Sequence, residues 1–161
     1  MIAHAQCDAS DLDINKKYVG TVVPPDTDSG PLAADGLKLM GGVAPWETDE
    51  DIAITYVKYR GAATAWLLRR LAPPPGAGPD ECCWNAVLDV LVPPKLESGE
   101  EFFASDCTVH GRLEPRLVAI TRAIPNKPEL SVRKVWTVDK KTLQFESVST
   151  KGVACTPTID D

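Results

Sequence analysis

The chain has 161 residues, of which 43% are hydrophobic and 25% charged, a composition typical of one domain with a packed core. No apolar run approaches the roughly 20 residues that a membrane-spanning helix needs, so we expect no transmembrane segment. Acidic residues outnumber basic residues by 23 to 17. A surface of that sign repels phosphate backbones, so we expect no nucleic-acid partner. We predict a flexible N-terminal lead-in over residues 1–17 and a single globular domain over residues 18–161.

Five cysteines are more than a cytosolic domain of this size usually carries, and no two of them have the CxxC spacing of a redox pair or zinc ribbon. Two neighbouring cysteines rarely bond each other, because a vicinal disulfide strains the peptide between them. The sequence therefore predicts two disulfides, in any of three connectivities, drawn from Cys82, Cys83, Cys107 and Cys155, with Cys7 left over.

The N-terminus, like the number of cysteines, favours a compartment outside the cytosol. Ala3-His4-Ala5 matches the small-x-small pattern that signal peptidase leaves before its cut. We expect a periplasmic or secreted protein whose signal peptide has been removed, with a cytoplasmic location as the alternative.

The first half of the chain predicts a strand, a loop and a helix. Tyr18–Val23 is a β-branched run that predicts a strand, and the proline- and glycine-rich residues 24–47 predict a long loop. Thr48 is a suitable N-cap for a helix with an acidic first turn and arginines in its last turn. Its apolar positions recur at helical spacing, at Ile52, Tyr56, Tyr59, Ala63, Trp66 and Leu67. The same residues are good β-formers, so a hairpin turning at Gly61 is the alternative.

The second half predicts shorter helices and then strands. Asp80 begins a second predicted helix with apolar residues at Trp84, Val87, Leu88 and Leu91. A capping box at residues 98–101, leading into Phe102 and Phe103, predicts a single helical turn. Residues 117–122, 132–138 and 142–148 predict a three-strand antiparallel meander. The predicted fold class is α+β, an antiparallel sheet with one or two helices packed on one face. A mainly-β fold is the alternative.

Histidine supply limits the possible catalytic chemistry, because the chain has only His4 and His110. Asp106, Cys107 and His110 lie close in sequence and suggest a small hydrolase or transferase, with Cys107 as nucleophile and His110 as base. The competing interpretation is a disulfide-bonded Cys107 beside a solvated His110.

A metal site is the third interpretation. Cys82, Cys83, Cys107 and His110 supply a Cys3His set suited to zinc or copper. Only Cys107 and His110 have the usual spacing of ligands, and disulfides account for the cysteines with fewer assumptions. We therefore predict no metal and no cofactor.

Two tryptophans and two arginines are candidates for contacts with a partner. Trp46 would be a binding anchor if the loop exposes it, although loop tryptophans often fold back over a core. Arg69 and Arg70, next to Trp66, suit a carboxylate, although charge compensation at a helix end also explains them. The sequence thus favours a non-enzymatic binding or inhibitor-type module, stabilised by disulfides, whose ligand is a protein or a small molecule. An acidic inhibitor would be steered toward a basic enzyme.

Overall fold

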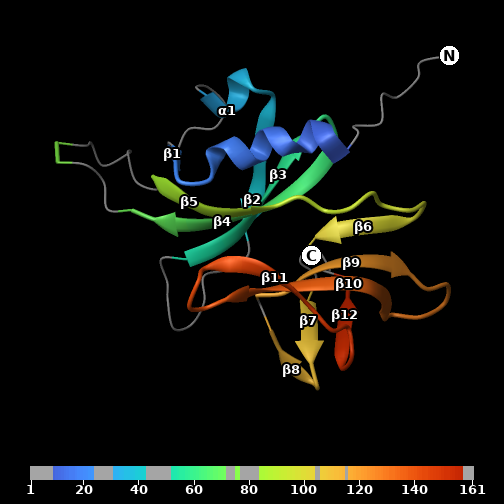
Figure 1. Cartoon of the computed structure of the whole chain (residues 1–161). Helices are drawn as coiled ribbons and strands as arrows, with labels where there is room; N and C mark the ends of the chain where they lie inside the picture. The colour runs from blue at the N-terminus through green and yellow to red at the C-terminus, as the bar shows by residue number, and fades with distance from the viewer. Residues whose placement is uncertain are drawn as a thin grey trace, which may run out of the picture.

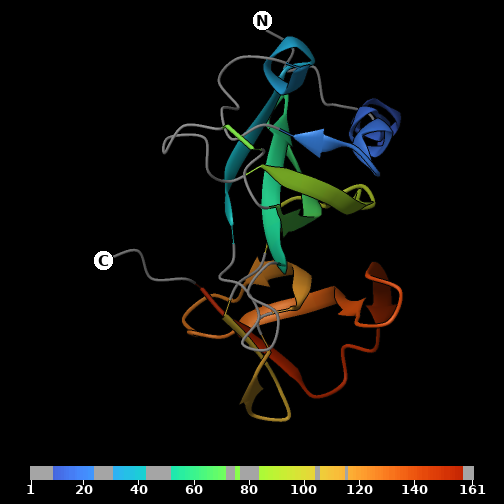
Figure 2. The same cartoon turned by 90° about the vertical axis from the view of Figure 1, so that its left-hand side faces the viewer.

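A computed structural model describes residues 9–23, 31–42, 52–71, 75–76, 84–103, 106–114 and 116–157. These residues form two antiparallel sheets, one in the upper half and one in the lower half of Figure 1, with two short helices beside the upper sheet. The view in Figure 2 shows the same division from the side. We call them the N-terminal sheet and the C-terminal sheet.

The N-terminal sheet has the strand order β1-β5-β4-β3-β2. Its strands are β1 (Val22–Val23), β2 (Leu37–Gly42), β3 (Ile52–Tyr59), β4 (Ala62–Arg70) and β5 (Asn85–Leu91). The helices are a 3-10 helix, η1 (Ala9–Tyr18), and a single α-helical turn, α1 (Pro31–Ala34).

The C-terminal sheet has the order β6-β9-β10-β12-β7-β8, and β11 also pairs with β10. Its strands are β6 (Glu100–Phe103), β7 (Asp106–Val109), β8 (Arg112–Leu113), β9 (Val118–Ala123), β10 (Leu130–Asp139), β11 (Gln144–Val148) and β12 (Val153–Thr156). Strands β9, β10 and β11 are the antiparallel meander that the sequence predicts.

The α+β prediction is wrong, because both long predicted helices are strands. Residues 52–70 form the β3–β4 hairpin, and its turn lies at Arg60 and Gly61, both with positive φ. Both faces of this hairpin are buried. Ile52 and Ile54 pack against the C-terminal sheet, whereas Val57 packs toward the helices. A strand that is buried on both faces loses the alternation of polar and apolar residues, so its apolar positions also satisfied a helical pattern.

A β-bulge explains the second wrong helix. Leu67 pairs with Asp89 but Leu68 pairs with Val87, so β5 contains one extra residue opposite this step of β4. As a result, Val87 and Val90 face the helices while Leu88 and Leu91 face the C-terminal sheet. The bulge changes the spacing from two to three, and the apolar positions then resemble those of a helix.

The remaining predicted boundaries also change. Tyr18 ends η1, and only Val22–Val23 of the predicted strand Tyr18–Val23 is extended. The predicted loop over residues 24–47 contains α1 and the edge strand β2. Residues 98–101 are not helical. Gly99, with a φ of +82°, lies in the turn that leads into β6.

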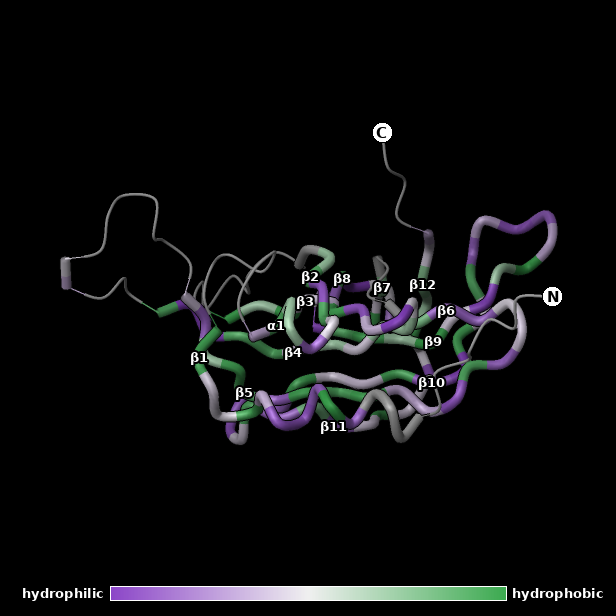
Figure 3. The backbone as a smooth tube through the Cα atoms, turned by 90° about the horizontal axis from the view of Figure 1, so that it is seen from above, coloured by the Kyte–Doolittle hydropathy of each residue, from purple (hydrophilic) through white to green (hydrophobic). Residues whose placement is uncertain are grey.

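The largest core lies where the two sheets meet. It joins buried residues of β3 and β4 to buried residues of the C-terminal sheet: Ile52, Ile54, Ala65, Leu67, Phe102, Val118, Ile120, Trp136 and Val138. Asp89, next to the β5 bulge, adds a polar link, because its carboxylate accepts a 2.8 Å hydrogen bond from the Phe145 amide of β11. Figure 3 shows hydrophobic positions along the strands inside the molecule and hydrophilic positions in the outlying turns.

A second core covers the outer face of the N-terminal sheet, beneath η1 and α1. The side chain of Asn15 in η1 is fully buried there. Its Oδ1 accepts hydrogen bonds from Trp66 Nε1 at 3.0 Å and Thr64 Oγ1 at 3.1 Å, both on β4. The Tyr18 ring packs on the Trp66 indole, with 5.3 Å between ring centroids. These contacts fasten η1 to the sheet.

We predict that Asn15→Ala lowers the free energy of unfolding by about 2 kcal/mol, because two buried hydrogen bonds of about 1 kcal/mol each are lost. The Trp66 indole keeps its contact with Thr64 at 3.1 Å and the Thr64 hydroxyl its contact with the Val57 carbonyl at 3.3 Å. Urea unfolding followed by tryptophan fluorescence measures the change. Lys16→Ala is the matched control, since Lys16 is exposed and its ion pair is with exposed Asp13. Equal effects of the two substitutions would contradict the structural role of Asn15.

Candidate functional site

The Cys107 side chain, the candidate nucleophile, is bonded to Cys155. The two residues lie directly opposite each other on β7 and β12, and both are buried. The disulfide is at the centre of a third core, with Leu117, Ala119 and Val135 packed around it. The bond therefore stabilises the C-terminal sheet, and Cys107 carries no free thiol while it is intact.

The candidate base, His110, lies in the tight turn between β7 and β8. It is exposed, and its amide donates a 2.8 Å hydrogen bond to the Gly152 carbonyl. Its ring rests against Gly152 so closely that a Cβ on that residue would lie 2.4 Å from His110 Cε1. A side chain at position 152 would therefore force the His110 ring to move, and the φ of +78° favours glycine there in any case.

The position of Cys107 in a disulfide counts against both the enzyme and the metal interpretation. The disulfide occupies the sulfur that a Cys107 nucleophile or a Cys3His site would need. Cys82 and Cys83 lie outside the described residues, as do His4 and Cys7, and the Asp106 side chain is also not described. Among the side chains that the structure describes, no three His, Cys, Asp or Glu residues are grouped as a metal ion would require.

The three predicted partner-binding residues that the structure describes do not form one surface. Trp66 is completely buried and bonded to Asn15, and Trp46 lies outside the described part of the chain. Arg69 and Arg70 are neighbours on a strand, so their side chains point to opposite faces of the sheet. The two arginines therefore cannot bind one carboxylate together. They also do not compensate the charge at the end of a helix, because both belong to β4.

A pocket of about 470 Å³, open to solvent, lies between η1, β1 and α1. Its walls are mainly apolar. Val22 is half exposed at the mouth, and Leu32 is buried beneath. The described residues that line the pocket are Lys17, Tyr18, Thr21, Val22, Val23, Pro31, Leu32, Ala34 and Asp35.

The polar end of this pocket is a three-residue cluster. The Tyr18 hydroxyl donates to Asp35 Oδ2 and lies 3.1 Å from the Pro31 carbonyl, and Lys17 Nζ also contacts Asp35 Oδ2. Two hydrogen bonds hold the pKa of Asp35 below its usual value. The one from Lys17 has the larger effect, and the one from Tyr18 has the smaller effect. Burial is the main cause that raises the pKa of Tyr18, and the hydrogen bond to Asp35 is the second. At neutral pH the cluster thus presents a carboxylate, a neutral phenol and an ammonium group.

Sequence reasoning missed this pocket because it treated residues 24–47 as one loop. A signal was present in the chain. Pro31 suits the first position of a helix, and Gly36, with a φ of +77°, suits the position just after its end. The two together mark α1 and place Asp35 at its C-terminus. Nothing in the sequence pairs Asp35 with Lys17 and Tyr18.

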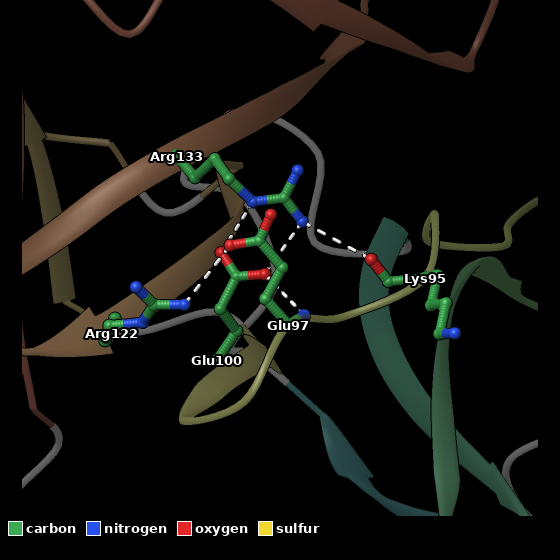
Figure 4. Close-up of polar contacts among 5 residues, drawn as sticks. All are labelled: Lys95, Glu97, Glu100, Arg122 and Arg133. Carbon is green, nitrogen blue, oxygen red and sulfur yellow. Dashed lines mark hydrogen bonds and ion pairs between the residues drawn. The ribbon is translucent and has the colours of Figure 1, made fainter. Parts of the chain in front are cut away.

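A second charged cluster connects β6, β9 and β10 of the C-terminal sheet (Figure 4). Arg133, at the bulge in β10, donates two hydrogen bonds to Glu100, at 2.5 and 2.8 Å. The Glu100 side chain is only 2% exposed. Arg122 pairs with exposed Glu97 at 3.3 Å. Both acids take part in the turn before β6, since the Glu97 amide donates to Glu100. We regard this cluster as structural.

Comparison with known proteins gives no match: no protein-family model fits the chain, and neither the characterised proteins nor the solved structures include a significant relative. Within the described ranges, no helix has the length and apolar character needed to cross a membrane. A disulfide is typical of a non-cytoplasmic setting. The function must therefore be inferred from the site.

We predict that Cys107 and Cys155 resist alkylation in urea until reductant is added, because their sulfurs are joined. Intact mass followed by peptide mapping identifies the protected pair. Removing the bond by Cys107→Ser with Cys155→Ser should cost about 4 kcal/mol of unfolding free energy on the chain-entropy model, since it closes a 48-residue separation. Alkylation of both thiols without reductant would contradict the bond.

The Glu100–Arg133 pair predicts a loss of stability in acid. The hydrogen bonds from Arg133 hold the pKa of Glu100 below its usual 4.5 in the folded protein. The pair therefore stabilises the fold above that value and ceases to do so as the pH falls through the lowered pKa. Urea unfolding between pH 7 and 3 should show a shallower acid dependence in Glu100→Gln. Glu101→Gln, exposed on the same strand, should keep the original dependence. Parallel curves for Glu100→Gln and the unmodified protein would refute the assignment.

Proposed function

We propose that the protein is a secreted or periplasmic binding module without catalytic activity, and that its ligand occupies the pocket between η1, β1 and α1. The ligand is a small molecule, or one side chain of a larger partner, with an apolar body. The cellular compartment and the binding role are separate parts of the proposal and rest on different observations.

The Cys107–Cys155 disulfide is the observation that favours a binding module over a hydrolase. The bond lies in a core and closes a 48-residue separation, which favours an oxidising compartment. A hydrolase using Cys107 and His110 would need this bond to be reduced before Cys107 could act as a nucleophile. The proposal instead assigns both residues to the support of the C-terminal sheet.

The pocket supports the binding role. Its volume of about 470 Å³ falls in the range of roughly 300–1,000 Å³ that is usual for small-molecule sites. Apolar walls and a few converging polar groups are also typical of such sites. The pocket has both features, because Val22, Val23 and Leu32 form walls and Asp35 is at one end. A protein partner remains the inhibitor-type variant of the proposal.

We test the site with n-hexanol, a probe that has an apolar body and no charge. We expect its addition to shift the amide NMR signals of residues 17–23 and 32–36 and to leave those of the C-terminal sheet unchanged. Val22→Asp should weaken binding about tenfold, because it places a carboxylate at an apolar wall. Val19→Asp is the matched control, since Val19 is also exposed but does not line the pocket. Equal weakening by both variants, or no shifts at all, would refute the site.

A further inference from the structure

We propose that the ligand of this pocket carries a primary ammonium group on an aliphatic body, and that this ammonium binds Asp35 in place of Lys17. The proposal rests on the proposed function, because it names the chemical class that the same pocket would take. It makes Lys17 a built-in competitor that occupies the site when no ligand is present.

The first observation is the arrangement around the Asp35 carboxylate. Both of its partners, Lys17 and Tyr18, contact Oδ2. Among the described residues, Oδ1 has no partner, and the side chain is 26% exposed. A carboxylate can accept several hydrogen bonds on its two oxygens. Asp35 therefore keeps an acceptor free for a donor that enters the pocket.

The second observation is that an ammonium group already occupies this place. Lys17 Nζ lies 2.5 Å from Asp35 Oδ2, so the site accommodates an ammonium in contact with the carboxylate. The Lys17 side chain is 54% exposed on a flexible stem. Exposed ion pairs of this kind contribute little to stability, so Lys17 can be displaced at low cost. A ligand ammonium would regain the same contact, and its alkyl chain would cover the apolar wall.

Tyr18 fixes the acceptor in position. Its ring is buried against Trp66, and its hydroxyl donates to Asp35. The hydrogen bond from Tyr18 to Asp35 does not involve Lys17, so it can persist when Lys17 is displaced. Preorganised groups lose less entropy on binding than mobile ones do. The acceptor is thus held by a buried side chain, whereas the Lys17 cation is on an exposed one.

The polar groups of the pocket also favour a cationic ligand over an anionic one. Lys17 is the one cation among the described residues that line the pocket, and it already contacts Asp35. An anionic head group bound to Lys17 would lie beside the Asp35 carboxylate, which repels it.

The experiment compares three probes that share a six-carbon chain: n-hexylamine, n-hexanol and hexanoate. Affinities are measured by amide NMR titration at pH 7 on the full chain, in the unmodified protein and three variants. We expect hexylamine to bind about tenfold more tightly than hexanol, because its head group forms a charged hydrogen bond. Asp35→Asn should abolish this preference, so that hexylamine and hexanol bind the variant with about equal affinity.

Lys17→Met is the decisive variant, because it removes the competitor and keeps the length of the side chain. It should raise the affinity for hexylamine relative to that for hexanol severalfold. Lys16→Met is its control, since the adjacent Lys16 pairs with Asp13 outside the pocket. Stronger binding of hexanoate than of hexylamine, with loss of hexanoate in Lys17→Met, would overturn the proposal in favour of an anionic ligand. Equal affinity for all three probes would overturn the head-group assignment alone, whereas no binding of any probe would refute the proposed function itself.

Discussion

The rest of the site depends on the hydrogen bonds that the buried side-chain carbonyl of Asn15 accepts. Asn15 Oδ1 accepts hydrogen bonds from Trp66 and Thr64 on β4, which fixes η1 against the outer face of the N-terminal sheet. The last turn of η1 carries Lys17 and Tyr18, so the same hydrogen bonds determine where the polar end of the pocket lies. An unpaired carbonyl or indole N–H would be costly in this core. The network therefore holds the helix in one position, and a preorganised ligand site needs such a scaffold.

The β3–β4 hairpin explains how one small chain can support both a site and a second sheet. One face of the hairpin packs against the C-terminal sheet through Ile52, Ile54 and Leu67, and the other face packs beneath the helices through Val57 and Trp66. The disulfide lies in a different core, within the C-terminal sheet. The molecule thus separates two tasks. The disulfide stabilises the sheet that is remote from the pocket, and a buried polar network positions the groups that would contact a ligand.

The sequence predicted the parts of the fold in which one physical signal dominates. The β9–β10–β11 meander was found because its strands are bounded by prolines and a compact turn after Asp139. The β3–β4 hairpin and β5 were mistaken for helices because burial on both faces and the bulge at Leu88 removed the two-residue period. The Cys107–Cys155 pair was within the predicted set, but its connectivity depends on a register that only the folded sheet provides. Long-range pairs such as Asn15 with Trp66, and Asp35 with Tyr18, leave no local pattern in the chain.

The central claim, that a buried hydrogen bond holds η1 and thereby the pocket, is tested most directly by hydrogen exchange of the Trp66 indole N–H, followed by NMR. The account predicts that this proton exchanges only through global unfolding, at a rate that tracks the free energy of unfolding as urea is added. Saturating n-hexylamine should slow the exchange further, because a ligand of the folded pocket stabilises the folded state. Rapid exchange that is insensitive to urea and to the probe would show that η1 opens independently of the sheet, and it would contradict the account.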